Sequence, residues 1–360
     1  MATTIHGTGG QAHDHQRRAL PPELGVFIAL LVIIGIFELL GALIVGQSLL
    51  FDTQGRFDGP LGLFNVARLK IMILQVAIVG IIAIGSTQVI ISGGIDLSPG
   101  SVVGITAMVA MSFAQVAEVN GLANPKPVFG AWAHDLAAIL PIVIGLAVGL
   151  IAGLINGALI AYTRIPPFIA TLGMMVFARG AAKWWTKGEP VSFPSEGYAA
   201  IGSGMMPVVI FVVLALLFHF LLKYTVYGKH TYAIGSNEDA ARMSGIKIQR
   251  HKLLVYAIAG MLAALAAIVL SAKNLTAQSG MGIMYELDAI AMTVIGGVSL
   301  AGGRGSILGT VLGALIFGVI ISGFTFLRLD AFYQEMVKGL IIVSAVVLDQ
   351  WRQRRAAARA

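Results

Sequence analysis

Long runs of apolar residues dominate the sequence, and several are long enough to cross a lipid bilayer as a helix. A crossing helix needs about 20 mostly apolar residues, because the hydrocarbon core of a bilayer is roughly 30 Å thick. Of the 360 residues, 57% are hydrophobic and 11% are charged, whereas soluble domains carry about 25% charged residues. Such a chain cannot remove its apolar surface from water by folding alone. The sequence therefore predicts an all-α polytopic membrane protein.

About ten ranges are candidates for transmembrane helices. They are 24–46, 71–92, 98–117, 136–162, 168–185, 206–223, 253–272, 287–300, 306–326 and 332–349. These ranges divide the chain into an N-terminal tail (1–23), a transmembrane domain (24–349) with a polar insert (225–252), and a basic C-terminal tail (350–360). The N-terminal tail lacks the order of regions found in a cleaved signal peptide. We therefore expect the first apolar range to remain as an anchor.

Lysine and arginine predict the orientation, because cytoplasmic loops carry them in excess. When the N-terminus is placed in the cytoplasm, most of the 24 lysines and arginines fall on that side, including those of the polar insert and the C-terminal tail. We therefore expect both termini and the insert to be cytoplasmic. This topology accounts for the net charge of +7 without a nucleic-acid partner, since no basic patch is interleaved with aromatic residues.

Glycines at intervals of four predict close packing between helices. Apolar burial does not drive helices together inside a bilayer, so association depends on small residues that let backbones approach. Two of the ranges carry such a series. The positions are Gly145, Gly149, Gly153 and Gly157 in the fourth range, and Gly305, Gly309 and Gly313 at the ninth.

Two glycine-rich loops resemble each other. GGIDLSPGSVVG (93–104) and GGVSLAGGRGSILG (296–309) both begin with two glycines and an aliphatic residue, contain a leucine and end in Ser-x-x-Gly. Paired glycine-interrupted apolar segments indicate a transport site, because unwound backbone offers free N–H and C=O groups to a polar solute. The loops predict a transport pathway and are compatible with an internal duplication.

Polar residues inside the apolar ranges are few. Glu335 and Lys338 are three residues apart on one predicted helix face, so we expect them to pair, and we expect Asn156 to bond a neighbouring helix. The ranges show no series of carboxylates of the kind that proton-coupled pumps carry. We therefore expect the chain to lack an energy source of its own.

The stretch TYAIGSNEDAARMSGIKIQRHK (231–252) interrupts this apolar pattern with a helix-forming polar segment. Ser236 is the predicted N-cap, with acidic residues in the first turn where the helix dipole favours them, and Gly245 is expected to end the helix. An apolar stripe is expected from Ala240, Ala241, Met243 and Ile246. The pattern allows two interpretations, a helix lying on the lipid surface or a helix that another protein grips.

Together with ISGGIDLSPGS, IPPFIATLGMM and VIGGVSLAGGRGSILGTVLGALI, this stretch resembles the permease subunit of bacterial ABC sugar importers of the ribose type. The four motifs occur in the family's order, from about the second range to the C-terminus. The resemblance implies a type II importer fold and a bacterial inner-membrane location. It also implies four partners: a second permease copy, a cytoplasmic ATPase that binds ATP and Mg²⁺, a periplasmic sugar-binding protein and membrane lipid.

The same resemblance implies the roles of particular residues. A coupling helix to the ATPase would match 235–246, with Gly235, Asn237, Glu238, Ala240, Ala241, Ser244 and Gly245 on the family's motif. The translocation pathway would include Gly93, Gly94, Asp96, Ser98, Pro166, Pro167 and Phe168. We interpret Asp96 as a helix cap in preference to a solute contact.

The sequence predicts no catalytic, cofactor or metal site in this chain. It has no Walker A sequence, and the metalloprotease and nucleophile-elbow motifs of an intramembrane enzyme are missing. The HDH triplet of the N-terminal tail (His13, Asp14, His15) is interpreted as part of a disordered segment.

The transported solute is left open. FTFLRLDAFYQEMVKG and KWWTKGEPVSF resemble permeases for myo-inositol or related polyols, so a polyol and a ribose-like sugar are both candidates. A sibling permease for nucleosides or branched-chain amino acids is an alternative. A secondary transporter is disfavoured because coupling-ion carboxylates are not recognised.

Overall fold

The chain is described here by a computed structural model that places residues 22–51 and 64–357. The predicted N-terminal tail, with its HDH triplet, lies almost wholly outside the described residues. Helices form most of the rest, with a few two-residue strands. In chain order the elements are α1 (Pro22–Leu40), the π-helical turn η1 (Gly41–Val45), α2 (Val66–Ile91), α3 (Pro99–Ala114), β1 (Glu118–Val119), β2 (Leu122–Ala123), η2 (Ala131–Ala133), α4 (Ile139–Thr163), α5 (Pro167–Trp185), β3 (Val191–Ser192), α6 (Glu196–Ala199), η3 (Ala200–Gly202), α7 (Met206–Tyr224), α8 (Val226–Ser236), α9 (Glu238–Met243), α10 (Ile248–Asn274), β4 (Thr276–Ala277), α11 (Tyr285–Ile295), α12 (Ile307–Phe326) and α13 (Ala331–Ala357).

Each of the ten predicted ranges contains a helix, and the polytopic helical fold is confirmed. Within the described residues, six helical spans are long and apolar enough to cross a bilayer. The first is formed by α1 together with η1, and the other five are α2, α4, α7, α10 and α12. The other predicted crossings are short or carry charged residues: α3 has 16 residues, α11 has 11, and α5 contains Arg179 and Lys183. The last helix continues to Ala357, so most of the predicted basic tail is helical.

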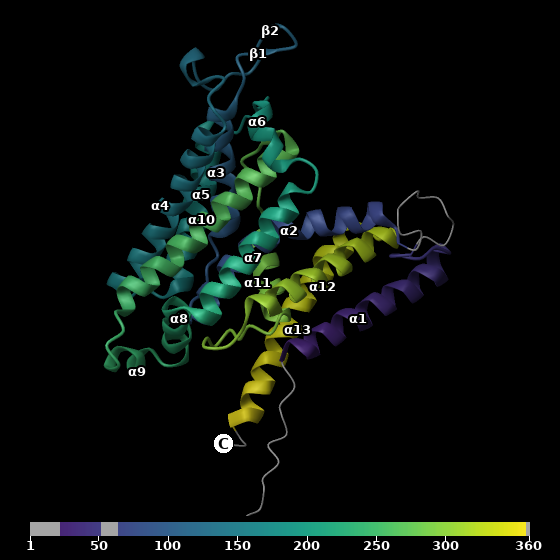
Figure 1. Ribbon diagram of the computed structural model, residues 1–360, viewed down its shortest axis with the longest axis vertical. Coiled ribbons are helices and arrows are strands. Elements are labelled where there is room, and N and C mark those ends of the chain that lie inside the picture. Colours follow the sequence, from purple (N-terminus) through teal and green to yellow (C-terminus); the bar gives the residue numbers. More distant parts are fainter. Residues whose placement is uncertain (1–21, 52–63, 358–360) are drawn as a thin grey trace, which may run out of the picture.

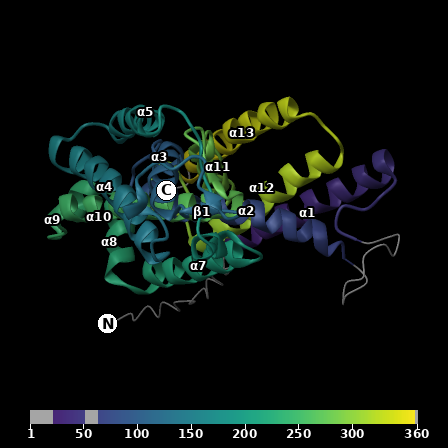
Figure 2. The same ribbon diagram turned by 90° about the horizontal axis from the view of Figure 1, so that it is seen from above.

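Helix α10 packs against α2, α3 and α4 and forms the inner helix of that part of the bundle (Figures 1 and 2). Most residues of α2, α10 and α12 are buried, whereas few residues of α1 and α7 are buried. This distribution is typical of a membrane bundle, in which peripheral helices present apolar residues to lipid.

The first glycine series lies on the α4–α10 contact. A side chain at Gly149 would meet the Gly260 carbonyl, and one at Gly153 would meet the Tyr256 carbonyl and, at 2.9 Å, the Ala257 Cα. A Cβ atom at Gly157 would lie 2.9 Å from the Leu253 Cα, while one at Gly145 would meet Ile268 and Ala110 at 3.1 Å. The four-residue spacing thus places backbone against backbone for three successive turns.

The second series brings α12 against α11. Gly309 faces the Gly296 carbonyl, and Gly313 faces the Met292 carbonyl and the Gly296 nitrogen. Gly305 precedes α12 in a turn with φ of +142°, packed against Val298. Glycine is required there both by the positive φ and by the close approach.

The pairing predicted for Lys338 is wrong. Its Nζ lies 3.0 Å from the Asp288 carboxylate on α11, and Glu335 is exposed. Helical spacing identifies only partners on the same helix, and here a buried carboxylate on a neighbouring helix is the partner. The pair therefore joins α13 to α11 inside the bundle.

The two ends of the bundle differ. One end carries the β1–β2 hairpin together with α6, and the other carries α8 and α9 (Figure 1). The start of α1 lies near α8 too: the Ser306 hydroxyl donates to Glu23 over 2.9 Å, and the Tyr232 hydroxyl of α8 donates to the Gly305 carbonyl over 2.8 Å. The beginning of the first helix and the polar insert therefore lie at the same end of the molecule.

Candidate functional site

The polar insert folds as two short helices joined by one extended residue. Asn237 has φ of −162° and ψ of 105°, and its side-chain Oδ1 accepts a hydrogen bond from the Ala240 nitrogen over 2.9 Å. The N-cap of α9 is therefore Asn237 and not Ser236, which belongs to the last turn of α8. Gly245 ends this unit with φ of +83°, as the sequence predicts.

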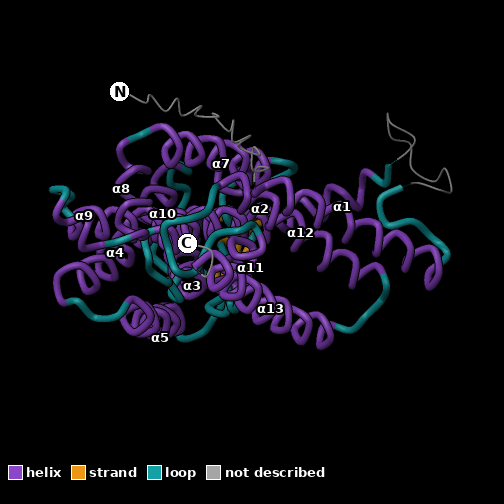
Figure 3. Tube along the Cα trace, turned by 90° about the horizontal axis from the view of Figure 1, so that it is seen from below, coloured by secondary structure: helices purple, strands orange, loops and turns teal. Residues whose placement is uncertain are grey.

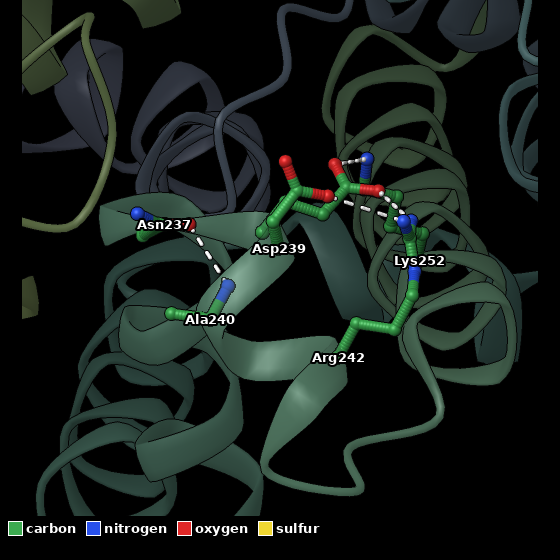
Figure 4. A network of polar contacts seen from close by, with 6 residues as sticks. Asn237, Asp239, Ala240, Arg242 and Lys252 are labelled. Atoms are coloured by element: carbon green, nitrogen blue, oxygen red, sulfur yellow. Dashed lines mark hydrogen bonds and ion pairs between the residues drawn. The ribbon is translucent and has the colours of Figure 1, made fainter.

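Glu238 fixes α9 to α10. Its carboxylate accepts from Arg242 Nη2 over 3.0 Å and from Lys252 Nζ over 2.6 Å, while Arg242 Nη1 also lies 3.2 Å from Asp239 (Figure 4). Ser244 closes the helix by donating to the Ala240 carbonyl over 3.0 Å. Because Glu238 binds a residue on each helix, α9 is held at a set angle to α10.

The predicted apolar stripe of α9 divides into two faces. Ala241 is buried in a small cluster with Ile234 and Ile248, against which Ile246 packs. Met243 instead is 89% exposed. A small apolar cluster thus supports the insert from within, and one methionine projects from it where a partner could bury it.

Asp96 lies in the loop between α2 and α3 and is buried. Its Oδ1 accepts from the Ser98 nitrogen over 2.8 Å and from the Ser98 hydroxyl over 2.7 Å. The N-cap residue of α3 is Ser98, so Asp96 is not the cap itself; it holds the turn that leads into the helix. Asn156 of α4 donates to the Ser98 hydroxyl over 2.9 Å, so its predicted interhelical bond is present.

The prolines of the predicted pathway lie in the turn between α4 and α5. Pro166 is the N-cap of α5, and Pro167 opens the helix, a position where proline's missing N–H is not needed. One turn on, Thr171 accepts from the Leu97 nitrogen over 3.2 Å and donates to the Pro167 carbonyl over 2.9 Å. Thr171, which the sequence analysis missed, thus joins the two predicted pathway motifs, and Phe168 is exposed.

A pocket connects this turn to the polar insert. It is lined by Arg164, Pro166 and Pro167 from one side, and by Glu238, Arg242 and Lys252 from the other. Residues predicted for the pathway and residues predicted for coupling therefore share a cavity wall.

The two glycine-rich loops converge on the end of α8. The Gly303 nitrogen donates to the Ile91 carbonyl over 2.9 Å, and a Cβ atom at Gly302 would lie 3.1 Å from the Gly93 Cα. Each loop runs into a helix whose N-cap is a serine, Ser98 for α3 and Ser306 for α12. The second loop is the longer of the two, since it runs from the end of α11 at Ile295 to Ser306, whereas the first runs from the end of α2 at Ile91 to Ser98.

Buried charges on α11 were missed from the sequence. Glu286 and Asp288 lie in its first turn and are buried, next to the start of the predicted eighth range. On α5, Arg179 Nη1 donates to the Ser279 and Met281 carbonyls, both over 2.8 Å, and it lies within electrostatic reach of Glu286. Asp288 lies inside the predicted range 287–300, and Glu286 lies one residue before it.

Among the described residues, no group of three or more His, Cys, Asp or Glu side chains is placed to hold a metal ion. The arrangement consists instead of a projecting polar helix, a proline turn and two converging loops. Such a geometry can transmit movement and offer backbone groups to a solute.

Residues 69–346 match the family described as branched-chain amino acid transport system / permease component. The chain is 40% identical to the ribose import permease protein RbsC of Bacillus subtilis (strain 168) over 344 residues, 94% of each chain. It is 38% identical to RbsC of Escherichia coli (strain K12) over 299 residues, 81% of this chain and 88% of the relative. It is also 35% identical over 345 residues to the galactose/methyl galactoside import permease protein MglC of the same strain, 92% of this chain and 95% of the relative. No solved structure matches the chain.

Proposed function

The chain belongs to the family of branched-chain amino acid transport system permease components, and from that premise we propose that it is the membrane permease of an ATP-driven sugar or polyol importer. Relatives that carry the names of ribose and galactose import permeases support a neutral sugar over the amino acid in the family's description. The location that follows is the bacterial inner membrane, with the N- and C-termini in the cytoplasm. The ten helices of the predicted ranges would form a type II importer fold.

The single observation that supports this function most is the polar insert. Helix α9 projects from the end of the bundle, is fixed to α10 through Glu238 and Lys252, and presents Met243 outward. Basic residues gather around it, including Arg242 and Lys252, as expected on the cytoplasmic side. We infer that α9 is the contact element for a separate ATPase, which would bind the ATP and Mg²⁺.

The charges inside the bundle favour a neutral solute and an external energy source. Asp288 is paired with Lys338, and a carboxylate neutralised in this way is a poor candidate for the carrier of a coupling ion. Glu286 makes no ion pair among the described residues, and its buried Oε2 has no hydrogen-bond partner there. A periplasmic binding protein would then deliver the solute, and nucleotide binding to the ATPase would tilt the helices and change the side from which the pathway opens.

A second copy of the chain would cover the face formed by α5 and α13. These helices lie on the same side of the molecule, with α3 and α11 between them and α7 on the opposite side (Figures 2 and 3). Large apolar residues are exposed on both helices, among them Phe177 and Val343, and Arg179 and Lys338 lie only partly buried beside them. Charges at membrane depth are costly against lipid, so we propose a homodimer through this face.

Uptake by proteoliposomes tests the proposed function. The chain would be reconstituted with the ATPase and binding protein encoded beside it, and supplied with tritiated ribose, galactose, myo-inositol, uridine or leucine. We expect ATP-dependent accumulation of one of the sugars or of myo-inositol. Accumulation of leucine or uridine in their place would identify the sibling permease instead.

A further inference from the structure

Three backbone segments come into close contact at the last turn of α8. Gly235 lies directly against the Ile91 carbonyl at the end of α2, and a Cβ atom there would also lie 2.7 Å from the Gly303 nitrogen. A Cβ atom at Gly302 would lie 2.7 Å from the Gly235 carbonyl oxygen. Because such contacts involve backbone alone, a shift of α8 cannot be absorbed by side-chain rotation. We refer to Ile91, Gly93, Gly235, Gly302 and Gly303 as the glycine junction.

Two tyrosines of α8 attach the helix to α2 and to the second glycine-rich loop. The Tyr232 hydroxyl donates to the Gly305 carbonyl over 2.8 Å, and the Tyr227 hydroxyl donates to the Gln88 Oε1 of α2 over 2.6 Å. Burial raises the pKa of Tyr232 above its ordinary value, and the charge of Glu23 raises it further. The Tyr232 hydroxyl therefore keeps its proton and remains a donor.

Helix α8 is in turn attached to α9 through a single residue. The Asn237 nitrogen donates to the Ala233 carbonyl of α8 over 3.1 Å, while the side chain of the same residue caps α9. Because the same residue contacts both helices, we expect a movement of α9 to displace the end of α8.

The contacts with α8 distinguish the two glycine-rich loops. The segment that makes the second loop longer contains Gly302, Gly303 and Gly305, and all three contact α8 or accept its tyrosine hydrogen bond. The first loop reaches the junction through Gly93. The additional residues of the second loop are thus the ones that contact the end of α8. A simple repeat of the first loop would lack these contacts.

We propose that α8 transmits the movement of α9 to both glycine-rich loops, and that Tyr232 is a positioning residue that keeps the second loop attached to α8. The inference rests on the proposed function, since it assigns the route by which an ATPase bound at α9 reaches the pathway. From the junction, the movement continues into α3 and α12, which begin at Ser98 and Ser306.

Tyr232→Phe tests this route, because it removes one hydroxyl and leaves the aromatic ring. The variant would be reconstituted as the full chain with its ATPase and binding protein, using tritiated ribose, galactose and myo-inositol as probes. Solute imported and ATP hydrolysed would be measured in the same vesicles. We expect hydrolysis to continue while the ratio of solute imported to ATP hydrolysed falls about fivefold, the factor that corresponds to one neutral hydrogen bond.

Tyr227→Phe should lower the ratio as well, through the attachment to α2. Tyr224→Phe is the matched control, because Tyr224 is exposed at the end of α7, and its ratio should equal that of the wild type. The inference is overturned if Tyr232→Phe keeps the wild-type ratio, or if Tyr224→Phe lowers it equally. Uptake by the wild type without nucleotide would instead refute the proposed function.

Discussion

At the scale of single residues, Glu238 combines two contacts that belong to different helices. One ion pair joins it to Arg242 within α9, and the other joins it to Lys252 at the start of α10. Helical spacing predicts the first pair, because residues four apart face each other. The second pair depends on how the chain returns after Gly245, which spacing alone does not determine.

Reversing the charge of Glu238 should uncouple ATP hydrolysis from uptake. In Glu238→Lys, both ion pairs become repulsions, so α9 loses its fixed angle to α10. We expect the ratio of solute imported to ATP hydrolysed to fall about fivefold, as two partly exposed pairs are worth on the order of 1 kcal/mol together. Membrane insertion, measured by the amount of chain in the membrane fraction, should not change.

Asp239→Lys is the matched control for this variant. Asp239 is 90% exposed and contacts only the Arg242 end of the same network, so the ratio should fall by about twofold at most. Equal losses in both variants would show that general charge around α9, and not the link to α10, determines coupling.

Residue-level predictions from the sequence succeed where the partner is local. The end of α9 at Gly245 follows from the chain itself, because a positive φ favours glycine. The partner of Lys338 is Asp288 on α11, and Thr171 on α5 accepts a hydrogen bond from Leu97 in the loop between α2 and α3. Such contacts depend on which helices become neighbours, so the sequence of one segment does not contain them.

At the scale of elements, the positions of the helices follow from the apolar ranges, and the closest contacts follow from the glycine series. Glycine at every fourth position of α4 lies on one side of the helix, and α10 packs against that side. The series predicts a close contact but not its partner. The sequence of the polar insert predicts a single helix, whereas the structure has two helices, α8 and α9, separated by Asn237.

Disulfide cross-linking tests the face formed by α5 and α13. The chain has no cysteine, so single cysteines at Phe177 and Val343 report on that face alone. After oxidation in membranes, we expect a covalent dimer on a non-reducing gel from at least one of these variants. Val213→Cys on α7 is the control, since Val213 is exposed on the opposite side. Dimers from the control alone would place the interface on the α7 side.

At the scale of the whole molecule, the polar insert joins features that are far apart in the sequence. Its first helix contacts both glycine-rich loops, and its second contacts α10 and lines a pocket with the turn before α5. The sequence identifies each of these segments by its glycines, prolines or charges. Their convergence at one end of the bundle is a property of the fold, and only the structure provides it.

The central claim is that the insert faces the cytoplasm and there contacts a separate ATPase. Met243→Cys tests it directly, because Met243 is 89% exposed and would be the chain's sole cysteine. A membrane-impermeant maleimide should label this variant in inside-out vesicles and not in right-side-out vesicles, and addition of the ATPase should protect it. Labelling in right-side-out vesicles, or labelling that the ATPase leaves unchanged, would contradict the account.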